Sequence, residues 1–274
     1  MECSAADKRA LLMRAKRMSL VSDFQILSGV VKGGRSRLAG LFNAAKVAVA
    51  GRRYLETANF VMNVIIDGRD ETDAESAARQ ARIIGRRHGR ETDASVPVIV
   101  RSAPFQPPTL LFSLDSNRWA PLHCIVPHSR FATMFGMIEA FCARHEATLK
   151  AHAIEWNASM ASVGSDAILI EPNFYWKDAA RPFFDHYLDA AYLKRANSAP
   201  ENPKAAAAVQ ELRLGLAQLF LEQGATHLQI GRMYLYREGR EPQIWALLQA
   251  IKSYVDPRNL MNPGALALER KDPA

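Results

Sequence analysis

The residues best suited to chemistry lie in the last third of the sequence, around one histidine and two tyrosines. His227 follows a predicted helix end at Gly224, and alternating apolar and polar residues from 228 to 235 predict that it lies on a strand. An imidazole titrates near neutral pH, so His227 can move a proton or bind an anionic substrate. Tyr234 and Tyr236 fall on one face of that strand, where either hydroxyl can hydrogen-bond a substrate oxygen. A hydrogen-bonded structural role is the competing interpretation of His227.

A second candidate cluster gathers a carboxylate, an amide and three aromatic rings at a predicted strand end, in the run Glu171-Pro172-Asn173-Phe174-Tyr175-Trp176. Such a set can wall a pocket for an aromatic or apolar substrate. Glu171, Tyr175 and Trp176 are therefore candidate substrate-binding residues. Packing alone is the alternative explanation for the same residues.

Asn262 is a third candidate, and unlike the others its backbone conformation is predicted to be restricted by its neighbours. Pro263 restricts the residue before it to extended geometry, and Pro263 and Gly264 fit the two central positions of a type II turn. The turn can therefore present the Asn262 amide rigidly to a ligand. A local Asx-type bond to the backbone is the alternative.

Metal-ligand patterns are absent from the sequence. His123 and His128 lie on either side of Pro127, which is poor geometry for a shared metal, and we interpret both as structural. The cysteines are few and widely spaced, which suggests a reducing compartment: Cys3, Cys124 and Cys142. We expect no bound metal.

Apolar periodicity predicts the elements that hold these residues. The predicted strands are residues 58 to 67, 96 to 100, 122 to 126, 148 to 156 and 166 to 171. One amphipathic helix precedes Gly89 and another follows Ser129, so the strands and helices form two ferredoxin-like β-α-β units. The predicted fold class is α+β, an antiparallel sheet with helices packed on one face, plus C-terminal helices.

Three helices are predicted after the sheet. They cover residues 178 to 196, residues 211 to 223, and a stretch that starts at Pro242 and stops before Pro257. The last helix carries an apolar face that we expect to pack on the core, made of Ile244, Trp245, Leu248, Ile251 and Val255.

Composition places the chain among ordinary globular proteins. Its 274 residues are 49% hydrophobic and 23% charged, no stretch approaches 18 uncharged apolar residues, and the N-terminus lacks a signal-peptide core. We divide the chain into a helical N-terminal extension, residues 1 to 54, and one compact domain, residues 55 to 274. We expect a cytoplasmic protein with no membrane partner.

The formal charge of +7 raises the question of nucleic-acid binding. The densest basic stretch, residues 82 to 90, closes a predicted helix, where cations interact well with the helix dipole. Aromatic residues that could stack on bases are missing there. We favour a solvated helix end and expect no nucleic-acid partner.

The chain end carries a family resemblance. An amphipathic helix closed by Asp256-Pro257 and then Asn262-Pro263-Gly264 resembles the C-terminus of FAD-linked oxidases of the vanillyl-alcohol oxidase superfamily. The segment Thr226-His227-Leu228 resembles the branch that oxidises aryl alcohols and cresols. Further matches follow in order upstream, so that the resemblance covers roughly residues 55 to 268: residues 101 to 105, 119 to 127 and 171 to 176.

The resemblance implies FAD as cofactor and hydride removal from a small hydroxylated or aromatic substrate onto flavin N5. In that family the C-terminal close returns toward the flavin, which makes Asn262 a candidate cofactor-binding residue. His227 and Tyr234 become candidate catalytic residues beside the substrate.

Two departures from the family pattern limit what carries over. The aryl-alcohol branch stabilises a phenolate with a Tyr-Arg pair just before Thr-His-Leu, but Gly224 and Ala225 stand at those positions here. The family binds FAD through a glycine-rich loop in an N-terminal domain, which residues 1 to 57 do not supply. The resemblance therefore covers the cap domain, and a partner chain would carry the FAD-binding domain. A non-catalytic binding domain and an inactive truncated product are the alternatives.

Overall fold

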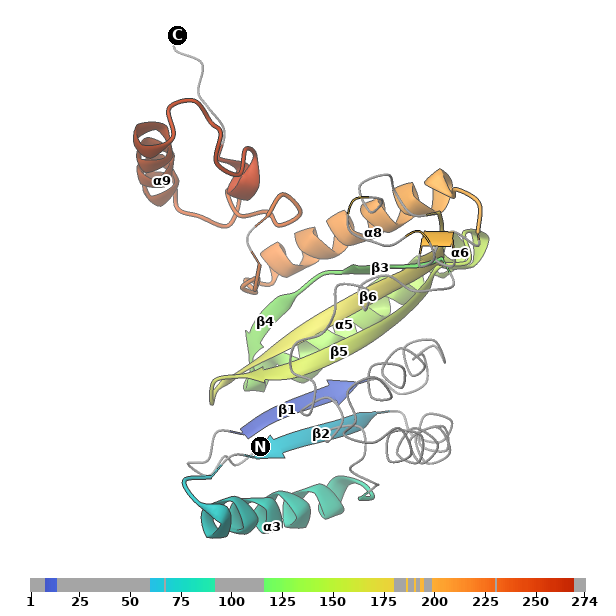
Figure 1. The fold of residues 1–274 in the computed structure, drawn as a ribbon, viewed down its shortest axis with the longest axis vertical. Coiled ribbons are helices and arrows are strands. Elements are labelled where there is room, and N and C mark those ends of the chain that lie inside the picture. The colour runs from blue at the N-terminus through green and yellow to red at the C-terminus, as the bar shows by residue number, and fades with distance from the viewer. Residues whose placement is uncertain are drawn as a thin grey trace.

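The centre of the fold is a six-stranded antiparallel sheet with the order β2-β1-β5-β6-β3, in which β4 also pairs with β6 (Figure 1). The computed structural model describes residues 8–13, 60–66, 68–91, 116–179, 186, 190, 193–194, 199–229 and 231–268. The strands are β1 (Lys8–Met13), β2 (Val61–Ile66), β3 (Asn117–Pro121), β4 (Cys124–Pro127), β5 (Glu155–Val163) and β6 (Ala167–Lys177). The predicted α+β class with an antiparallel sheet is confirmed.

The helices are α3 (Glu71–His88), α5 (Phe131–Arg144), α6 (Glu146–Ala151), α8 (Pro203–Glu222) and α9 (Pro242–Val255), with 3-10 turns at His128–Arg130 and Ala265–Ala267. Helix α3 contacts β2, whereas α5 and α8 both contact β6. Helix α8 starts where Asn202 caps it by accepting a hydrogen bond from the Ala205 backbone N–H at 3.1 Å. Within the described residues, no helix is long and apolar enough to cross a membrane.

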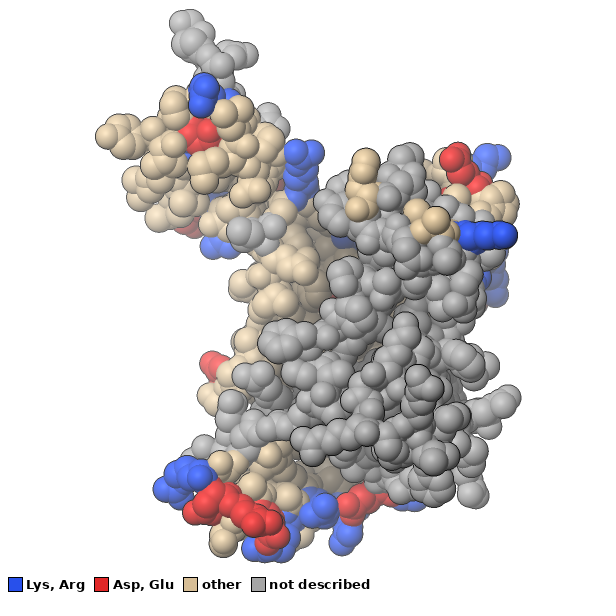
Figure 2. Space-filling model, viewed as in Figure 1, with Lys and Arg blue, Asp and Glu red and all other residues tan. Residues whose placement is uncertain are grey.

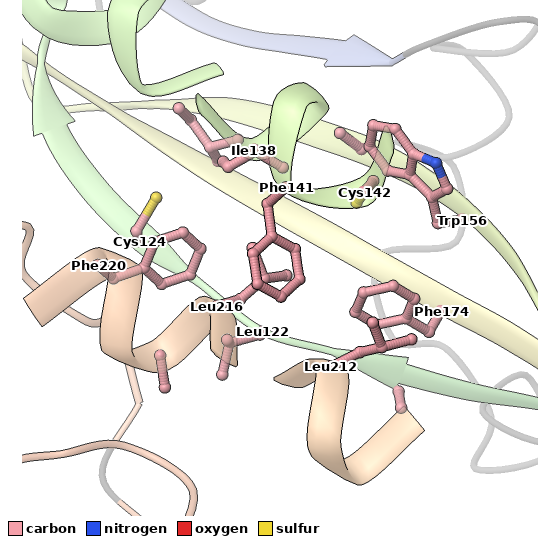
Figure 3. Packing of buried hydrophobic residues seen from close by; sticks show 14 of the residues in the cluster. Leu122, Cys124, Ile138, Phe141, Cys142, Trp156, Phe174, Leu212, Leu216 and Phe220 are labelled. Carbon is pink, nitrogen blue, oxygen red and sulfur yellow. The ribbon is translucent and has the colours of Figure 1, made fainter. Parts of the chain in front are cut away.

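The main core lies between the sheet and the helices α5 and α8 (Figure 3). Ile170 and Phe174, which point to one face of β6, are both fully buried, as is Leu122 beside them. The two helices also touch each other directly. A Cβ atom at Gly215 would lie 2.8 Å from the ring of Phe141, so glycine is needed for this close approach.

The strand predicted for residues 148 to 156 is wrong in its first half, which belongs to α6. Leu149 is the buried residue of that helix, and its backbone N–H donates to the His145 carbonyl at 3.0 Å. Ala153 then adopts a φ of 50°, which ends the helix before β5 begins at Glu155. A short apolar run fits either period, and here the local helical bonds decide it.

The N-terminal segment was predicted to be helical, and at residues 8–13 this is wrong. Those residues form β1, which pairs with β2 on one side and with β5 on the other. Sheet pairing overrides the local helical composition at this position. The other residues of the 1 to 54 extension, the strand at 96 to 100 and most of the helix at 178 to 196 lie outside the described residues.

Helix α9 stands apart from the sheet, in a part of the chain that we call the C-terminal lobe, residues 236–268 (Figure 1). Its predicted core face is wrong, because Ile251 is 49% exposed and Val255 is 62% exposed. Trp245 is half-buried and lies beneath the Arg237 guanidinium, 5.7 Å from the ring centroid. Figure 2 shows a largely uncharged surface on the lobe, at the upper left.

Candidate functional site

Strands β3 and β4 both pair with β6 in the same antiparallel register. This register places His123 directly opposite Glu171. Leu122, the residue before His123, donates its backbone N–H to the Pro172 carbonyl at 3.0 Å. Because side chains alternate across a sheet, Leu122 enters the core and His123 points to the other face. There His123 Nε2 lies 2.5 Å from Glu171 Oε2. His123 is only 5% exposed, so this contact is largely shielded from water.

Tyr234 bonds to the other side of the same imidazole. Its hydroxyl oxygen lies 2.8 Å from His123 Nδ1 and also accepts the His123 backbone N–H at 3.2 Å. An ionised Glu171 can only accept, so His123 Nε2 carries the proton and Nδ1 accepts from the Tyr234 hydroxyl. Tyr234, His123 and Glu171 therefore form one directional series of hydrogen bonds, which is buried at Tyr234 and His123.

His227 packs on Tyr234, so the two predicted catalytic residues do come together. Their rings are stacked with centroids 4.7 Å apart, and Tyr236 meets the imidazole edge-on at 5.6 Å. His227 Nδ1 lies 2.8 Å from the Gln229 carbonyl oxygen, which can only accept, so Nδ1 carries the proton. His227 Nε2 is buried and finds no hydrogen-bond partner in the described part of the chain. Nε2 is therefore an acceptor left unsatisfied by the described residues.

The strand predicted from 228 to 235 is wrong, because among residues 225–229 and 231–235, which the structure describes, only Thr226 pairs with the sheet edge, at Ile125. Those two residues exchange backbone hydrogen bonds of 2.6 Å and 3.1 Å. A longer antiparallel ladder would next use the backbone N–H of His123. That N–H donates to the Tyr234 hydroxyl instead. After Thr226 the chain leaves the edge of β4. It comes back at Tyr234, whose hydroxyl takes the place of the next ladder hydrogen bond.

Burial and charge act in opposite directions on the Tyr234 hydroxyl. Burial raises its pKa, while the hydrogen bond from the His123 backbone and the charge of Arg213 oppose that rise. Arg213 reaches over from α8 and donates from Nη2 to the Pro121 carbonyl at 2.9 Å. Burial lowers the pKa of Arg213, and its Nε atom has no partner among the described residues. Tyr234 is thus held neutral beside a cation that would favour its anion.

Glu171 shares its face of β6 with Asn173 and Tyr175, as two-residue spacing requires. Asn173 is 1% exposed and accepts from Trp119 Nε1 at 2.5 Å. Burial is the main cause that raises the pKa of Tyr175 to about 12, so its hydroxyl stays protonated. This face of the sheet is polar and aromatic, unlike the apolar core face behind it.

Trp176 points to the opposite face, away from Glu171 and Tyr175. It packs against the core, and its Nε1 donates to Asp178 Oδ2 at 3.2 Å. The structure therefore brings Glu171 and Tyr175 to the candidate site but not Trp176. Odd spacing along one strand is the physical reason.

His123 is the site residue that the sequence interpretation missed. The sequence predicts a structural role for it, because His123 and His128 are poorly placed to share a metal ion. The alternation in residues 119 to 126 held the missing signal, since it separates His123 from the apolar residues Leu122 and Cys124. The partners of His123 come from β6 and from residue 234, which sequence spacing does not link to it.

Asp256 holds the loop that follows α9 and leads to the Asn-Pro-Gly turn. Its carboxylate accepts backbone N–H bonds from Leu260 and Met261, both at 2.9 Å, and pairs with Lys252. These contacts, led by the hydrogen bond from Lys252, lower the pKa of Asp256 to about 2. The Asp-Pro half of the motif is therefore a hydrogen-bonded loop held by one carboxylate.

Asn262 is exposed and opens the predicted turn. Ala265 donates its N–H to the Asn262 carbonyl at 3.0 Å, and Gly264 has a φ of 77°, which confirms the type II geometry. The extended backbone predicted for Asn262 is wrong, since its φ is 46°. Asparagine tolerates this left-handed conformation better than most residues.

The turn is tied to the loop that carries Tyr234. Arg232 donates from Nη2 to the Pro263 carbonyl at 2.5 Å, and Leu266 donates to the Gly231 carbonyl at 3.3 Å. A Cβ at position 264 would lie 3.2 Å from Arg232 Nε, so Gly264 also permits this approach. These contacts hold the turn and the loop together.

The segment that contains His227, Tyr234 and this turn has a known relative. Residues 225–266 match the family model of the C-terminal domain of FAD linked oxidases. This match confirms the resemblance to FAD-linked oxidases at the end of the chain. No curated protein matches the chain.

Two solved structures are similar to the chain over most of its length. They are a 4-ethylphenol oxidase from Gulosibacter chungangensis in an isoeugenol complex and an alkyldihydroxyacetonephosphate synthase. The first is 9% identical, with 96% of this chain and 48% of that one covered and a TM-score of 0.39. The second is 10% identical, with 98% and 44% covered and a TM-score of 0.44. At these scores neither likeness assigns a fold or an activity, and the chain spans less than half the length of either protein.

The family implies FAD, and some described residues fit the ring of that cofactor. His227 Nε2 is a buried atom with no hydrogen-bond partner among the described residues, so it could accept a hydrogen bond from a ring donor. Asn262 exposes an amide on a fixed turn, and an isoalloxazine edge carries both donors and acceptors that suit an amide. His227 and Asn262 are therefore the residues of this segment that could hold the flavin ring of an FAD-linked oxidase.

Proposed function

We propose that this chain is the cap, or substrate, half of a flavin-dependent oxidoreductase that oxidises a small hydroxylated or aromatic substrate. The observation that carries the proposal is the convergence of Glu171 and His227 on the buried side chains of His123 and Tyr234. Three of these four residues were candidates on sequence grounds. The segment that supplies two of them matches an FAD-linked oxidase family.

The polar groups suit a substrate hydroxyl, and the rings suit an aromatic body. Tyr234 offers an oxygen at the end of a hydrogen-bonded series, and the stacked pair of Tyr234 and His227 offers a flat aromatic edge. Tyr175 and Trp119 face each other across β3 and β6 on the polar face. FAD, when bound, would accept the hydride. The chain would bind and orient the substrate and manage its proton.

We propose further that a partner chain supplies the FAD-binding domain. The C-terminal lobe supports this, because its helix leaves large apolar side chains to solvent: Ile244, Leu247, Ile251, Tyr254 and Val255. Exposed apolar surface of this kind is typical of a contact with another polypeptide. The chain purified alone is expected to be colourless, and a stoichiometric flavin spectrum from it would contradict the proposal.

The decisive experiment is anaerobic flavin reduction in the complex of this chain with the FAD-binding polypeptide. We expect 4-alkylphenols or benzylic alcohols to bleach the flavin. His227→Gln and Asn262→Ala should each slow reduction by about 10²- to 10³-fold, the usual cost of losing one preorganised hydrogen-bonding group. His88→Gln, at an exposed residue of α3, is the matched control for handling and folding.

A complex that forms but never reduces its flavin would favour the alternative of a non-catalytic binding domain. Normal reduction rates in both site variants, measured per folded molecule, would reject the site assignment. A large loss of melting temperature with unchanged activity would show that Asn262 is only a turn residue.

A further inference from the structure

The hydrogen-bonded series begins at the Tyr234 oxygen, which can accept one more hydrogen bond. The Tyr234 oxygen donates its proton to His123 Nδ1 and accepts the His123 backbone N–H. A phenolic oxygen has two lone pairs, so one of them has no partner in this arrangement. A hydroxyl that donates to this lone pair would extend the series to four groups, with Glu171 at its far end.

We infer that Tyr234, His123 and Glu171 form a proton relay that removes the hydroxyl proton of an alcohol or phenol substrate. This inference rests on the proposed function and names the chemical group on which the site acts. Tyr234 is the catalytic residue, because it would touch the substrate. His123 and Glu171 act through it as relay and positioning residues.

The directions of the hydrogen bonds determine where each proton goes. The substrate O–H bond breaks toward the Tyr234 oxygen while the Tyr234 O–H bond breaks toward His123 Nδ1. The proton then rests on His123, whose imidazolium pairs with the Glu171 carboxylate. FAD, the two-electron oxidant of the proposed function, would accept a hydride from the substrate when it is bound. The substrate would then lose one proton to the protein and one hydride to the cofactor.

The charges around Tyr234 favour this direction of transfer. Arg213 reaches toward it from α8 and favours a negative charge on its oxygen, whereas Glu171 on β6 opposes one. Burial raises the pKa of Cys124 on β4 to about 12, so this neighbour stays a neutral thiol. The Glu171 carboxylate lies 2.5 Å from His123 Nε2, so it would pair directly with the imidazolium that forms when His123 receives the proton.

His227 is less suited to hold the proton. Its Nδ1 donates to the Gln229 carbonyl, and in the described part of the chain no carboxylate pairs with it. A charge on His227 would have no counter-ion, whereas a charge on His123 has Glu171. His227 therefore orients a donor through Nε2, and His123 receives the proton.

The relay is testable in the chain without flavin, using 4-nitrophenol as a probe whose ionised form is coloured. We expect the bound probe to be ionised at a pH where the free probe is mostly neutral. Tyr234→Phe and Glu171→Gln should bind the probe but leave it neutral. His88→Gln, which alters an exposed residue of α3, should behave as wild type.

Proton NMR supplies a second readout that needs no bound probe. A short hydrogen bond between His123 and ionised Glu171 should give a far-downfield resonance, present in His88→Gln and lost in Glu171→Gln. In the flavin complex, Tyr234→Phe should lower kcat by about 10²- to 10⁴-fold, the range for general acid–base catalysis, with little change in KM.

Equal ionisation of the probe in wild type and Tyr234→Phe would overturn the relay. So would a downfield resonance that Glu171→Gln leaves unchanged. A chain that ionises the probe but whose complex never reduces flavin would retain the relay and reject the oxidoreductase function. Failure to bind any phenol, with the NMR resonance absent, would reject both the relay and the substrate site.

Discussion

The sheet and the C-terminal lobe hold their structure by different means. In the sheet and its helices, Phe174, Ile170 and Leu216 are each 0% exposed. In the lobe, Leu247 is 58% and Met261 63% exposed. The lobe instead depends on polar contacts around Asp256 and Arg232. Hydrophobic burial therefore stabilises the body of the molecule, whereas a few hydrogen-bonded turns shape its end.

The largest effect should come from the core of the sheet. Phe174→Ala removes a fully buried ring and should lower the free energy of unfolding by about 3 to 5 kcal/mol. Chemical denaturation followed by tryptophan fluorescence measures this change. A shift equivalent to less than about 1 kcal/mol would show that the core is not where the structure places it.

Acid should open the lobe before it unfolds the sheet. The pKa of Asp256 is lowered in the folded state from its ordinary value of 3.8 to about 2, mainly through its bond with Lys252. Its contribution is therefore complete above about pH 4 and is lost as the pH falls toward 2. Amide exchange at Leu260 and Met261 should rise over this range. Asp256→Asn should make that exchange fast at neutral pH, and unchanged exchange in this variant would contradict the role of the carboxylate.

Trp245→Ala should have an intermediate effect. The ring is half-buried beneath Arg237, so its removal should cost about 1 to 2 kcal/mol, less than Phe174→Ala. Denaturation midpoints of the two variants, measured side by side, give the comparison. A cost for Trp245→Ala equal to that of Phe174→Ala would mean that the lobe has a buried core of its own.

The smallest stability effect should come from the exposed stripe of α9. Leu247→Asp changes a 58% exposed side chain and should alter the free energy of unfolding by no more than about 0.5 kcal/mol. The same variant should weaken association with the proposed FAD-binding chain by at least about tenfold. Glu238→Asp, in the same lobe, is the matched control. Unchanged association in Leu247→Asp would remove α9 from the proposed interface.

Local chemistry in the sequence predicted several features correctly. Pro263 and Gly264 have few conformations open to them, so the type II turn follows from their identity. Strong apolar periodicity predicted α5 and most of α8, and the alternation around Leu122 predicted β4. Residue chemistry also predicted His227, Tyr234 and Glu171 as site residues. The structure brings them together, and their role stays a prediction.

Periodicity did not determine which apolar faces are buried. The stripe on α9 has the same pattern as a core helix, yet the structure leaves it exposed. The alternation from 228 to 235 has the pattern of a strand, yet the neighbouring edge has no free N–H to extend the ladder. Both outcomes depend on which surface lies opposite, and a periodic pattern does not specify that.

The sequence by itself determined the class of fold, the turn at Pro263 and the residue types available for catalysis. Only the tertiary structure decided that His123 joins Glu171 to Tyr234. That contact needs one register between β4 and β6 and the return of a loop from residue 234, which lies 111 residues away from His123. Turn and helix preferences act over a few neighbours, whereas register is set by packing the whole sheet against its helices. The candidate site is a product of that packing.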